Sequence, residues 1–323
     1  MAKTKKMRLC TFILTGLILL APIGALAAGE DTPSRFVQYA VRSGLDNVTT
    51  VVSSGFASKA SEYSSELSSG AAGSGMTMVE GSTPAVIDTS NVSEGYVSVG
   101  YISSKPLKVL YYTTNPSSPV NYDMSNDGSL TRIPLTLGSG KYTIQIAENI
   151  SGTRYALVAT STAQYTDAGT LNKYLQSIPT IEFNASMPCI VKAAELTASS
   201  SSTNERVTAI YNYVIANVSY DTPKSESTLT NYSPNPESTY QTRKGICYDF
   251  ASLFAAMCRS QGIPCKLVKG FCTGVSGYHA WNSVYVDGAW RTVDTSSDSI
   301  YLAAKRSTPM YKTNYVVSVS SEY

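Results

Sequence analysis

Short stretches in the middle of the chain alternate apolar and polar residues, which is the pattern of half-buried β-strands. Between about residues 85 and 165 these stretches are 95–102, 107–114, 131–137, 141–148 and 154–160. Turn-forming residues such as those of Asn126-Asp127-Gly128 separate some of the stretches. The even spacing of short strands predicts a small antiparallel β-sandwich.

The pattern changes to helical spacing after about residue 170. In 204–221 the apolar residues form one stripe, which consists of Val207, Ile210, Tyr211, Val214, Ile215 and Val218. In 248–264 a second stripe consists of Phe250, Leu253, Phe254 and Met257, and Gly262 and Pro264 mark the end of that helix. Three β-like runs follow at 265–272, 278–286 and 290–295, so this region mixes helices and strands.

The first 28 residues have the pattern of a secretory signal peptide. Basic residues precede an apolar run from Leu9 to about Leu20, and Ala25-Leu26-Ala27 supplies a cleavage site of small residues. An uncleaved membrane anchor is the alternative, and the polar residues that follow favour removal. No second apolar run of membrane length follows, so we expect a soluble exported protein, either extracellular or at the cell surface.

We expect four parts along the chain. They are the signal peptide (1–28), a Ser/Gly/Ala-rich segment and linker (29–84), the β-rich sandwich-like domain (85–168) and an α+β domain (170–323).

Charge and cysteine content exclude several classes of function. The net charge of +2 becomes about −2 once the four basic residues of the signal peptide are removed, so nucleic acid is not an expected partner. The remaining cysteines are Cys189, Cys247, Cys258, Cys265 and Cys272. Five is an odd number, so at least one thiol has no partner within the chain. The chain has one histidine and no C-x-x-C, so we expect no structural zinc site and no cofactor.

Cys247 lies where the second predicted helix begins. A thiol at a helix N-terminus is a candidate nucleophile, because the helix dipole favours the thiolate. Gly245 allows a tight turn into the helix, and Arg243 and Lys244 add positive charge. The alternative is a small buried residue, which is the usual role of cysteine and the better interpretation of Cys258. Cys265 and Cys272 are either a disulfide pair or core residues.

His279 and Asp294 lie on two strands that Asp287-Gly288 joins as a two-residue hairpin. This turn places Val286 opposite Ala289 and Asp294 opposite Trp281. Because side chains alternate along a strand, His279 and Asp294 share a face as diagonal neighbours, roughly 7–8 Å apart at Cα. The alternatives are a core or surface histidine and an aspartate that caps a strand end.

The order Cys, His, Asp is that of an activated thiol. Cys247 attacks an acyl carbon, His279 pairs with the thiolate and protonates the leaving amine, and Asp294 orients the imidazole. Backbone N–H groups at the helix start are the expected oxyanion donors, and Gln241 is a weaker candidate for that support. We expect His279 to be exposed and its replacement by alanine to leave the fold intact.

Two segments carry a family resemblance, "KGICYDFASLFAAMCRSQGIPCKLVKGF" and "YHAWNSVYVDGAWRTVDTS". They resemble the transglutaminase-like superfamily of secreted bacterial proteins, in the glycine before the cysteine, the "GIP" turn, the H-A-W and the G-x-W-x-x-x-D. The resemblance covers about residues 182–298. It implies a papain-like α+β core with the thiol helix packed on an antiparallel sheet, and the roles given above for Cys247, His279 and Asp294. It implies no metal.

We therefore expect a secreted thiol enzyme that acts on amide bonds of proteins or peptides through a thioester, either as a protease or amidase or as a protein-glutamine acyltransferase. Its expected partners are protein or peptide substrates, cell-wall peptides included, with no nucleic acid and no membrane after signal removal. The alternative is a non-catalytic adhesion protein of the cell surface, for which the β-rich domain and 23 tyrosines would be suited.

Overall fold

The computed structural model describes residues 37–38, 76–79, 85–114, 119–226, 232–313 and 315–323. The predicted signal peptide and most of the predicted linker lie outside these residues. None of the helices within the described ranges has the length and apolar character that crossing a bilayer requires.

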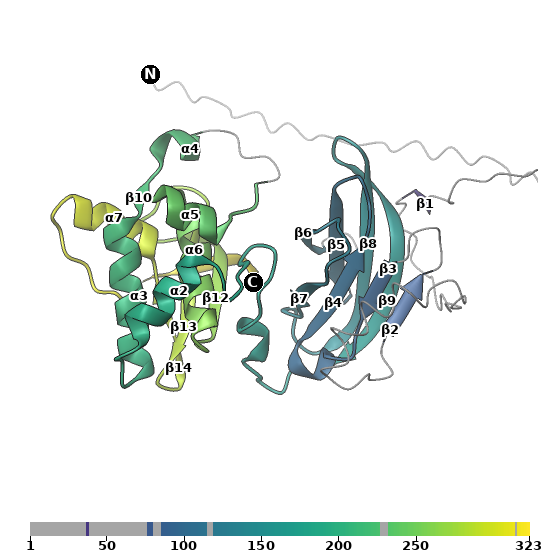
Figure 1. The fold of residues 1–323 in the computed structure, drawn as a ribbon, viewed down its shortest axis with the longest axis horizontal. Helices are drawn as coiled ribbons and strands as arrows, with labels where there is room; N and C mark the ends of the chain where they lie inside the picture. The colour runs from purple at the N-terminus through teal and green to yellow at the C-terminus, as the bar shows by residue number, and fades with distance from the viewer. Residues whose placement is uncertain (1–36, 39–75, 80–84, 115–118, 227–231, 314) are drawn as a thin grey trace, which may run out of the picture. The chain divides into compact units, whose positions relative to one another are not determined.

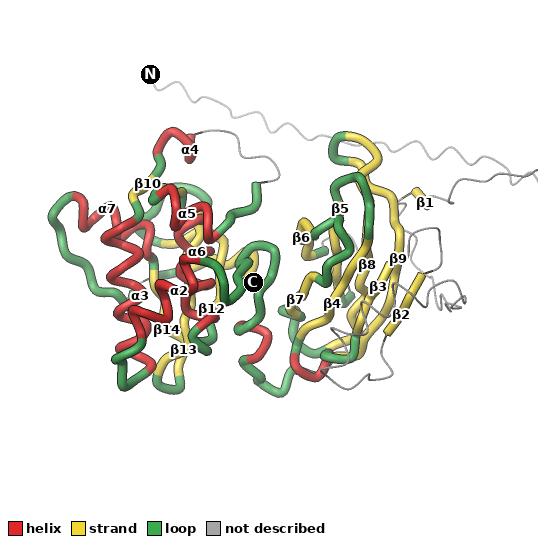
Figure 2. Tube along the Cα trace, in the orientation of Figure 1, coloured by secondary structure: helices red, strands yellow, loops and turns green. Residues whose placement is uncertain are grey.

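The β-rich region consists of two antiparallel sheets (Figures 1 and 2). One has the order β2 (Met76–Val79), β3 (Ala85–Asp88), β4 (Tyr96–Tyr101) and β7 (Thr131–Pro134). The other has the order β1 (Val37–Gln38), β9 (Arg154–Tyr165), β8 (Gly140–Ser151), β5 (Leu107–Tyr112) and β6 (Val120–Met124). Strands β1 and β2 lie within the segment predicted as a linker, so parts of that segment belong to the sheets.

The core of the β-rich region comes from alternating strand positions. Val97 and Val99 of β4 and Val109 and Tyr111 of β5 are fully buried, as the period-two pattern predicts. The sequence indicated five of these strands and missed β1, β2, β3 and β6, which are runs of only two to five residues.

The following region combines helices with a four-stranded sheet. The helices are α2 (Pro188–Thr197), α3 (Thr203–Asn217), α4 (Thr222–Glu226), α5 (Pro236–Thr242), α6 (Cys247–Ser260) and α7 (Thr295–Ala303). The sheet has the order β14 (Ala289–Val293), β13 (His279–Val286), β12 (Cys265–Cys272) and β15 (Val317–Glu322), and all its strand pairs are antiparallel. The predicted fold class, an α+β core preceded by a β-rich region, is confirmed.

Helix α6 is the centre of this core. Eleven of its residues, from Asp249 to Arg259, are buried, so nearly the whole circumference of the helix faces protein. The Asn282 amide of β13 donates to the backbone oxygens of Ala251, at 2.9 Å, and of Lys266, at 3.1 Å, and so joins the helix to two strands. A helix fixed on all sides holds its first residue, Cys247, in a defined place.

The buried Arg259 side chain fastens the other end of α6. Its guanidinium donates to three backbone oxygens, those of Cys265 (2.9 Å), Gln176 (2.6 Å) and Tyr323 (2.8 Å). The residue is 3 % exposed, so removing the guanidinium would take a donor from each of these oxygens in a dry environment, although the Tyr323 oxygen would keep the N–H of Leu267 at 3.1 Å.

We expect Arg259→Met to lower the free energy of unfolding of the core by about 3 kcal/mol or more, because it leaves buried carbonyl groups unpaired. Urea unfolding followed by tryptophan fluorescence measures this, since both tryptophans, Trp281 and Trp290, lie on the core sheet. Arg291→Met removes an exposed guanidinium from β14 and is the control. Equal urea midpoints for the two variants would contradict this role of Arg259.

Candidate active site

Cys247 is the first residue of α6, as the sequence predicted, and it is partly exposed. The chain approaches this helix through Gly245, and a Cβ atom there would lie 2.5 Å from the Cβ of Asp249. Only glycine allows that approach. The Asp249 carboxylate accepts the N–H of Ile246 at 2.8 Å and pairs with Lys224 at 2.7 Å, so the turn before the cysteine is fixed by a buried, neutralised acid.

A short parallel bridge brings Tyr220 to the same place. Strand β10 (Ser219–Tyr220) pairs with β11 (Lys244–Gly245), so Tyr220 lies opposite Gly245, two residues before the cysteine. The Tyr220 ring stacks on Phe250 of α6, and its hydroxyl interacts with the backbone N–H of Cys247. Burial and the neighbouring Cys247 raise the pKa of Tyr220, so its hydroxyl remains protonated. No local sequence pattern indicates this residue, because the contact joins two distant segments.

The hairpin that carries His279 has the predicted register. Val286 pairs with Ala289 and Asn282 with Val293, and Asp287 and Gly288 have φ of 51° and 78°, as a two-residue turn of this type requires. The sequence placed Asp294 on the second strand, but β14 ends at Val293. Asp294 instead begins α7 as its N-cap, and its carboxylate accepts the N–H of Ser297 at 3.0 Å.

The structure brings His279 and Asp294 together: Nε2 of the imidazole and Oδ2 of the carboxylate lie 2.8 Å apart. His279 was expected to be exposed, and this expectation is wrong. The imidazole is 5 % exposed and stacks on Trp281, with 6.2 Å between ring centroids. Since the side chain packs in this way, replacing it by alanine removes buried contacts as well as chemistry.

Asp294 is fully buried and its carboxylate accepts several hydrogen bonds. The Ser296 hydroxyl donates to Oδ1 at 2.9 Å, and the hydroxyls of Ser297 and Tyr315 donate to Oδ2 at 2.7 and 2.9 Å. Burial alone would raise the pKa of this carboxyl, but His279 and the hydrogen bonds of Ser297 outweigh burial and hold the pKa well below its ordinary value. The acid is therefore ionised at neutral pH.

The Asp294 carboxylate and the Cys247 side chain both act on the imidazole. Burial lowers the pKa of His279, but the hydrogen bond with Asp294 and the interactions with the Cys247 side chain outweigh it and raise the pKa to about 10. The imidazole is therefore held as a cation, which is the charge state that pairs with a thiolate.

The other predicted residues lie elsewhere. Gln241 is an exposed residue near the end of α5, and its amide donates to Glu237 at 2.6 Å, so the structure pairs it with that acid and not with Cys247. All five described cysteines are free. Cys258 is fully buried, as the core interpretation predicted, and Cys265 and Cys272 are separate buried thiols.

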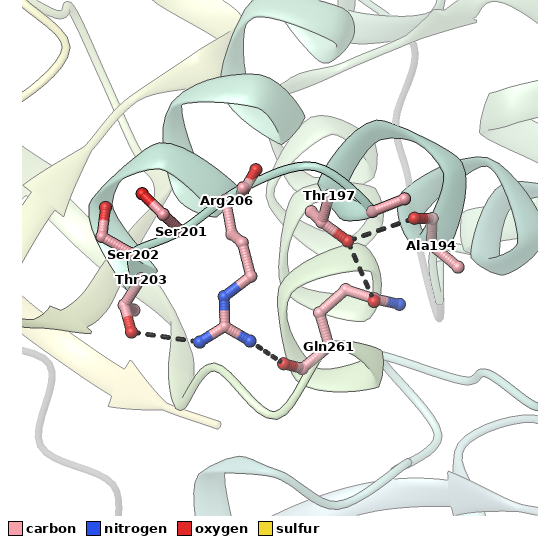
Figure 3. A pocket seen from close by; sticks show the side chains of 9 residues that line it. Ala194, Thr197, Ser201, Ser202, Thr203, Arg206 and Gln261 are labelled. Carbon is pink, nitrogen blue, oxygen red and sulfur yellow. Dashed lines mark hydrogen bonds between the residues drawn. The ribbon is translucent and has the colours of Figure 1, made fainter.

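Figure 3 shows a polar pocket at the opposite end of α6. Thr197, Arg206 and Gln261 line it, and Arg206 donates to the Gln261 backbone oxygen at 2.9 Å. Gln261 follows the last turn of a helix that begins at Cys247, so the pocket lies about 20 Å along the helix from the thiol. It is not part of the candidate active site.

Residues 191–295 match the family model described as the transglutaminase-like superfamily. This segment contains Cys247, His279 and Asp294 and covers about a third of the chain. The resemblance found in the sequence is confirmed for this part of the chain, which has a transglutaminase-like core.

Curated relatives match over a short segment. The chain is 33 % identical over 103 residues to the kyphoscoliosis peptidases of Mus musculus and Homo sapiens. The alignment covers 28 % of this chain, and the chain spans 15 % of the length of these relatives.

Solved structures give broader but more distant matches. A candidate cysteine protease from Cytophaga hutchinsonii is 16 % identical, with a TM-score of 0.35, and the match covers 71 % of this chain and 87 % of that one. The periplasmic domain of TgpA from Pseudomonas aeruginosa is 17 % identical, with a TM-score of 0.34, and covers 71 % of this chain and 74 % of its own.

Because Tyr315 donates to the oxygen that also contacts His279, we expect Tyr315→Phe to raise the pKa of His279 further. A carboxylate that loses a donor binds the imidazolium more strongly. The chain has one histidine, so its imidazole resonance in an NMR titration reports this pKa without ambiguity. Tyr311→Phe, which removes a hydroxyl bonded to Asn204, is the matched control. An unchanged or lowered pKa in Tyr315→Phe would contradict the assignment.

The ion pair of His279 and Asp294 makes stability depend on pH. The raised pKa of His279 stabilises the fold fully below the ordinary imidazole pKa of 6.5, and this contribution is lost as pH rises through about 10. The lowered pKa of Asp294 contributes above 3.8 and is lost on acidification. We expect the stability difference between the wild type and His279→Gln, measured by urea unfolding, to be largest near pH 5–6 and to shrink toward pH 10. A difference that is constant over this range would refute the ion pair.

Proposed function

We propose that this protein is a secreted thiol enzyme that acts on amide bonds of proteins or peptides through Cys247, His279 and Asp294. One observation carries the proposal: the imidazole of His279 lies 2.8 Å from a buried carboxylate and interacts with a thiol at the start of a helix. This is the arrangement of nucleophile, base and orienting acid that acyl transfer requires.

In the proposed reaction the thiol proton of Cys247 resides on His279. The sulfur attacks the amide carbon, and the carbonyl π electrons move to oxygen. When the tetrahedral intermediate collapses, the C–N bond breaks and the nitrogen leaves with the proton from His279. A thioester to Cys247 remains. Asp294 keeps its negative charge throughout and stabilises the imidazolium.

The oxyanion needs donors at the helix start. Since no residue four positions earlier in the helix accepts from it, the backbone N–H of Cys247 points out of the helix end, where the dipole also favours negative charge. The Tyr220 hydroxyl, which interacts with that N–H in the free protein, is the second proposed donor, and in the proposed intermediate both groups turn from each other to the oxyanion. In this proposal Tyr220 has the supporting role that was expected of Gln241.

Either water or an amine can release the thioester. Water that loses its proton to His279 gives a carboxylic acid, as in a protease or amidase, and a primary amine gives a new amide, as in a protein-glutamine acyltransferase. We propose hydrolysis, because water is present at high concentration unless the site excludes it.

The proposed location is outside the cytoplasm, on the evidence of residues 1–28 and their cleavage site. The mass of the mature protein recovered from culture medium or the cell surface tests it. A full-length mass would contradict removal of the signal peptide.

We expect Cys247→Ala to abolish amide turnover and Asp294→Asn to lower kcat by about 10³–10⁴-fold, because the imidazole loses its orienting charge. The assay incubates the mature protein with casein-derived and glutamine-containing peptides and a labelled primary amine. Cys189→Ala, which removes a fully buried thiol on α2, is the matched control and should keep wild-type activity.

Two results would contradict the proposal. Label incorporation that depends on Cys247 would replace hydrolysis by transamidation. Alkylation of Cys247 by iodoacetamide at the rate of free cysteine, together with no turnover, would instead favour a non-catalytic adhesion protein.

A further inference from the structure

Lys269 lies on β12, one of the two inner strands of the sheet next to the candidate active site. It pairs with Ala280 across β12 and β13, and the next residue, Gly270, pairs with His279. The side chain is partly buried. Its ammonium lies over the ring of Tyr248, the residue that follows Cys247, which places the charge near the start of α6.

Three tyrosine rings surround the ammonium. Its Nζ atom lies 4.4 Å from the ring centroid of Tyr248, 5.5 Å from that of Tyr323 and 6.0 Å from that of Tyr278. Ring faces attract a cation but carry no net charge. These three rings form a tyrosine cage, which fixes the position of the ammonium without neutralising its charge.

None of the ion pairs found in the described part of the chain includes Lys269. Lys266, three residues earlier on the same strand, also lies over aromatic rings but pairs with Glu322 at 2.9 Å. Burial lowers the pKa of Lys269, and the nearby Cys247 raises it. A half-buried cation without a carboxylate is costly unless an anion from outside completes it.

The cage has an open side. Tyr278 is 52 % exposed, and it contacts Phe271, which is 53 % exposed, with 5.5 Å between ring centroids. Large exposed rings near a candidate active site are typical of a surface that receives a ligand. A substrate lying over these rings would meet the ammonium and the sulfur together.

We propose that Lys269 binds a carboxylate that the substrate carries close to its scissile amide, so that the preferred substrates of this site are acidic peptides. The proposal adds a substrate preference to the proposed function, and it rests on that function in so far as it concerns a substrate. The binding of an anion beside Cys247 is testable without any turnover.

The first experiment compares two alkylating reagents of similar size at Cys247, iodoacetate, which is an anion, and iodoacetamide, which is neutral. The ratio of their rates in the wild type should exceed the ratio for free cysteine and should decline with added salt. In Lys269→Met this ratio should fall by roughly threefold to tenfold, because the iodoacetate rate falls more than the iodoacetamide rate. Lys266→Met, which removes the same charge from the same strand, should leave the ratio nearly unchanged.

Three results would overturn the inference. The first is an equal iodoacetate-to-iodoacetamide ratio in Lys269→Met and Lys266→Met. The second is an equal loss of both alkylation rates in Lys269→Met, which would make Lys269 a stabiliser of the thiolate. The third is a wild-type ratio no higher than that of free cysteine. The last measurement needs no variant, so the inference stays testable if Lys269→Met fails to fold. Lys269→Arg, which keeps the charge, should retain the high ratio.

The second experiment locates the carboxylate on the substrate. Matched glutamine peptides carry Glu or Gln next to the reacting residue, and each is made with a free and an amidated C-terminus. We expect kcat/KM to favour one carboxylate form over its neutral partner by about tenfold in the wild type and to lose this preference in Lys269→Met. Turnover without any preference would overturn the inference about Lys269 but leave the proposed enzymatic function standing. Anion-selective alkylation without turnover would support anion binding by Lys269 but contradict the proposed enzymatic function.

Discussion

A single buried carboxylate organises the candidate active site. Asp294 is fully buried at the junction of β14 and α7, and its negative charge is stable there only because several donors surround it. One donor is the imidazole of His279, and the others come from the first turn of α7 and from Tyr315. The same acid therefore begins a helix and fixes a ring, so the geometry of the site is a consequence of how the core folds.

The sulfur is positioned by different means. Helix α6 is buried along its length, Arg259 fastens its end, and the close approach of Gly245 to Asp249 fixes its start. Strands β10 and β11 add Tyr220 to the same place. Because the thiol and the imidazole come from separate elements that are each held by the core, little conformational entropy remains to be lost when they meet a substrate.

Local sequence signals were sufficient for much of this arrangement. Asp287-Gly288 specifies a two-residue turn, and the turn fixes the register that brings His279 near Asp294. The start of α6 at Cys247 followed from the glycine and the apolar stripe. Both signals depend on residues close together in the chain, where geometry leaves few alternatives.

Contacts between distant segments could not be predicted in this way. Tyr220 and Tyr315 reach the site from parts of the chain whose patterns say nothing about Cys247 or Asp294. Helix α7 was interpreted as the end of a strand, because a cap and a strand end both favour aspartate. The burial of His279 depends on Trp281 and its surroundings, which a single strand pattern does not define.

The segment that carries Tyr315 continues directly into β15, the strand that pairs with β12 along one side of the core sheet. A protease that cleaved the chain just before Tyr315 would thus remove both β15 and a hydrogen-bond donor of Asp294 in one event. Preparations that contain such clipped chains would look nearly uniform in size on a gel, yet in some of the molecules the buried acid would have lost one of its donors.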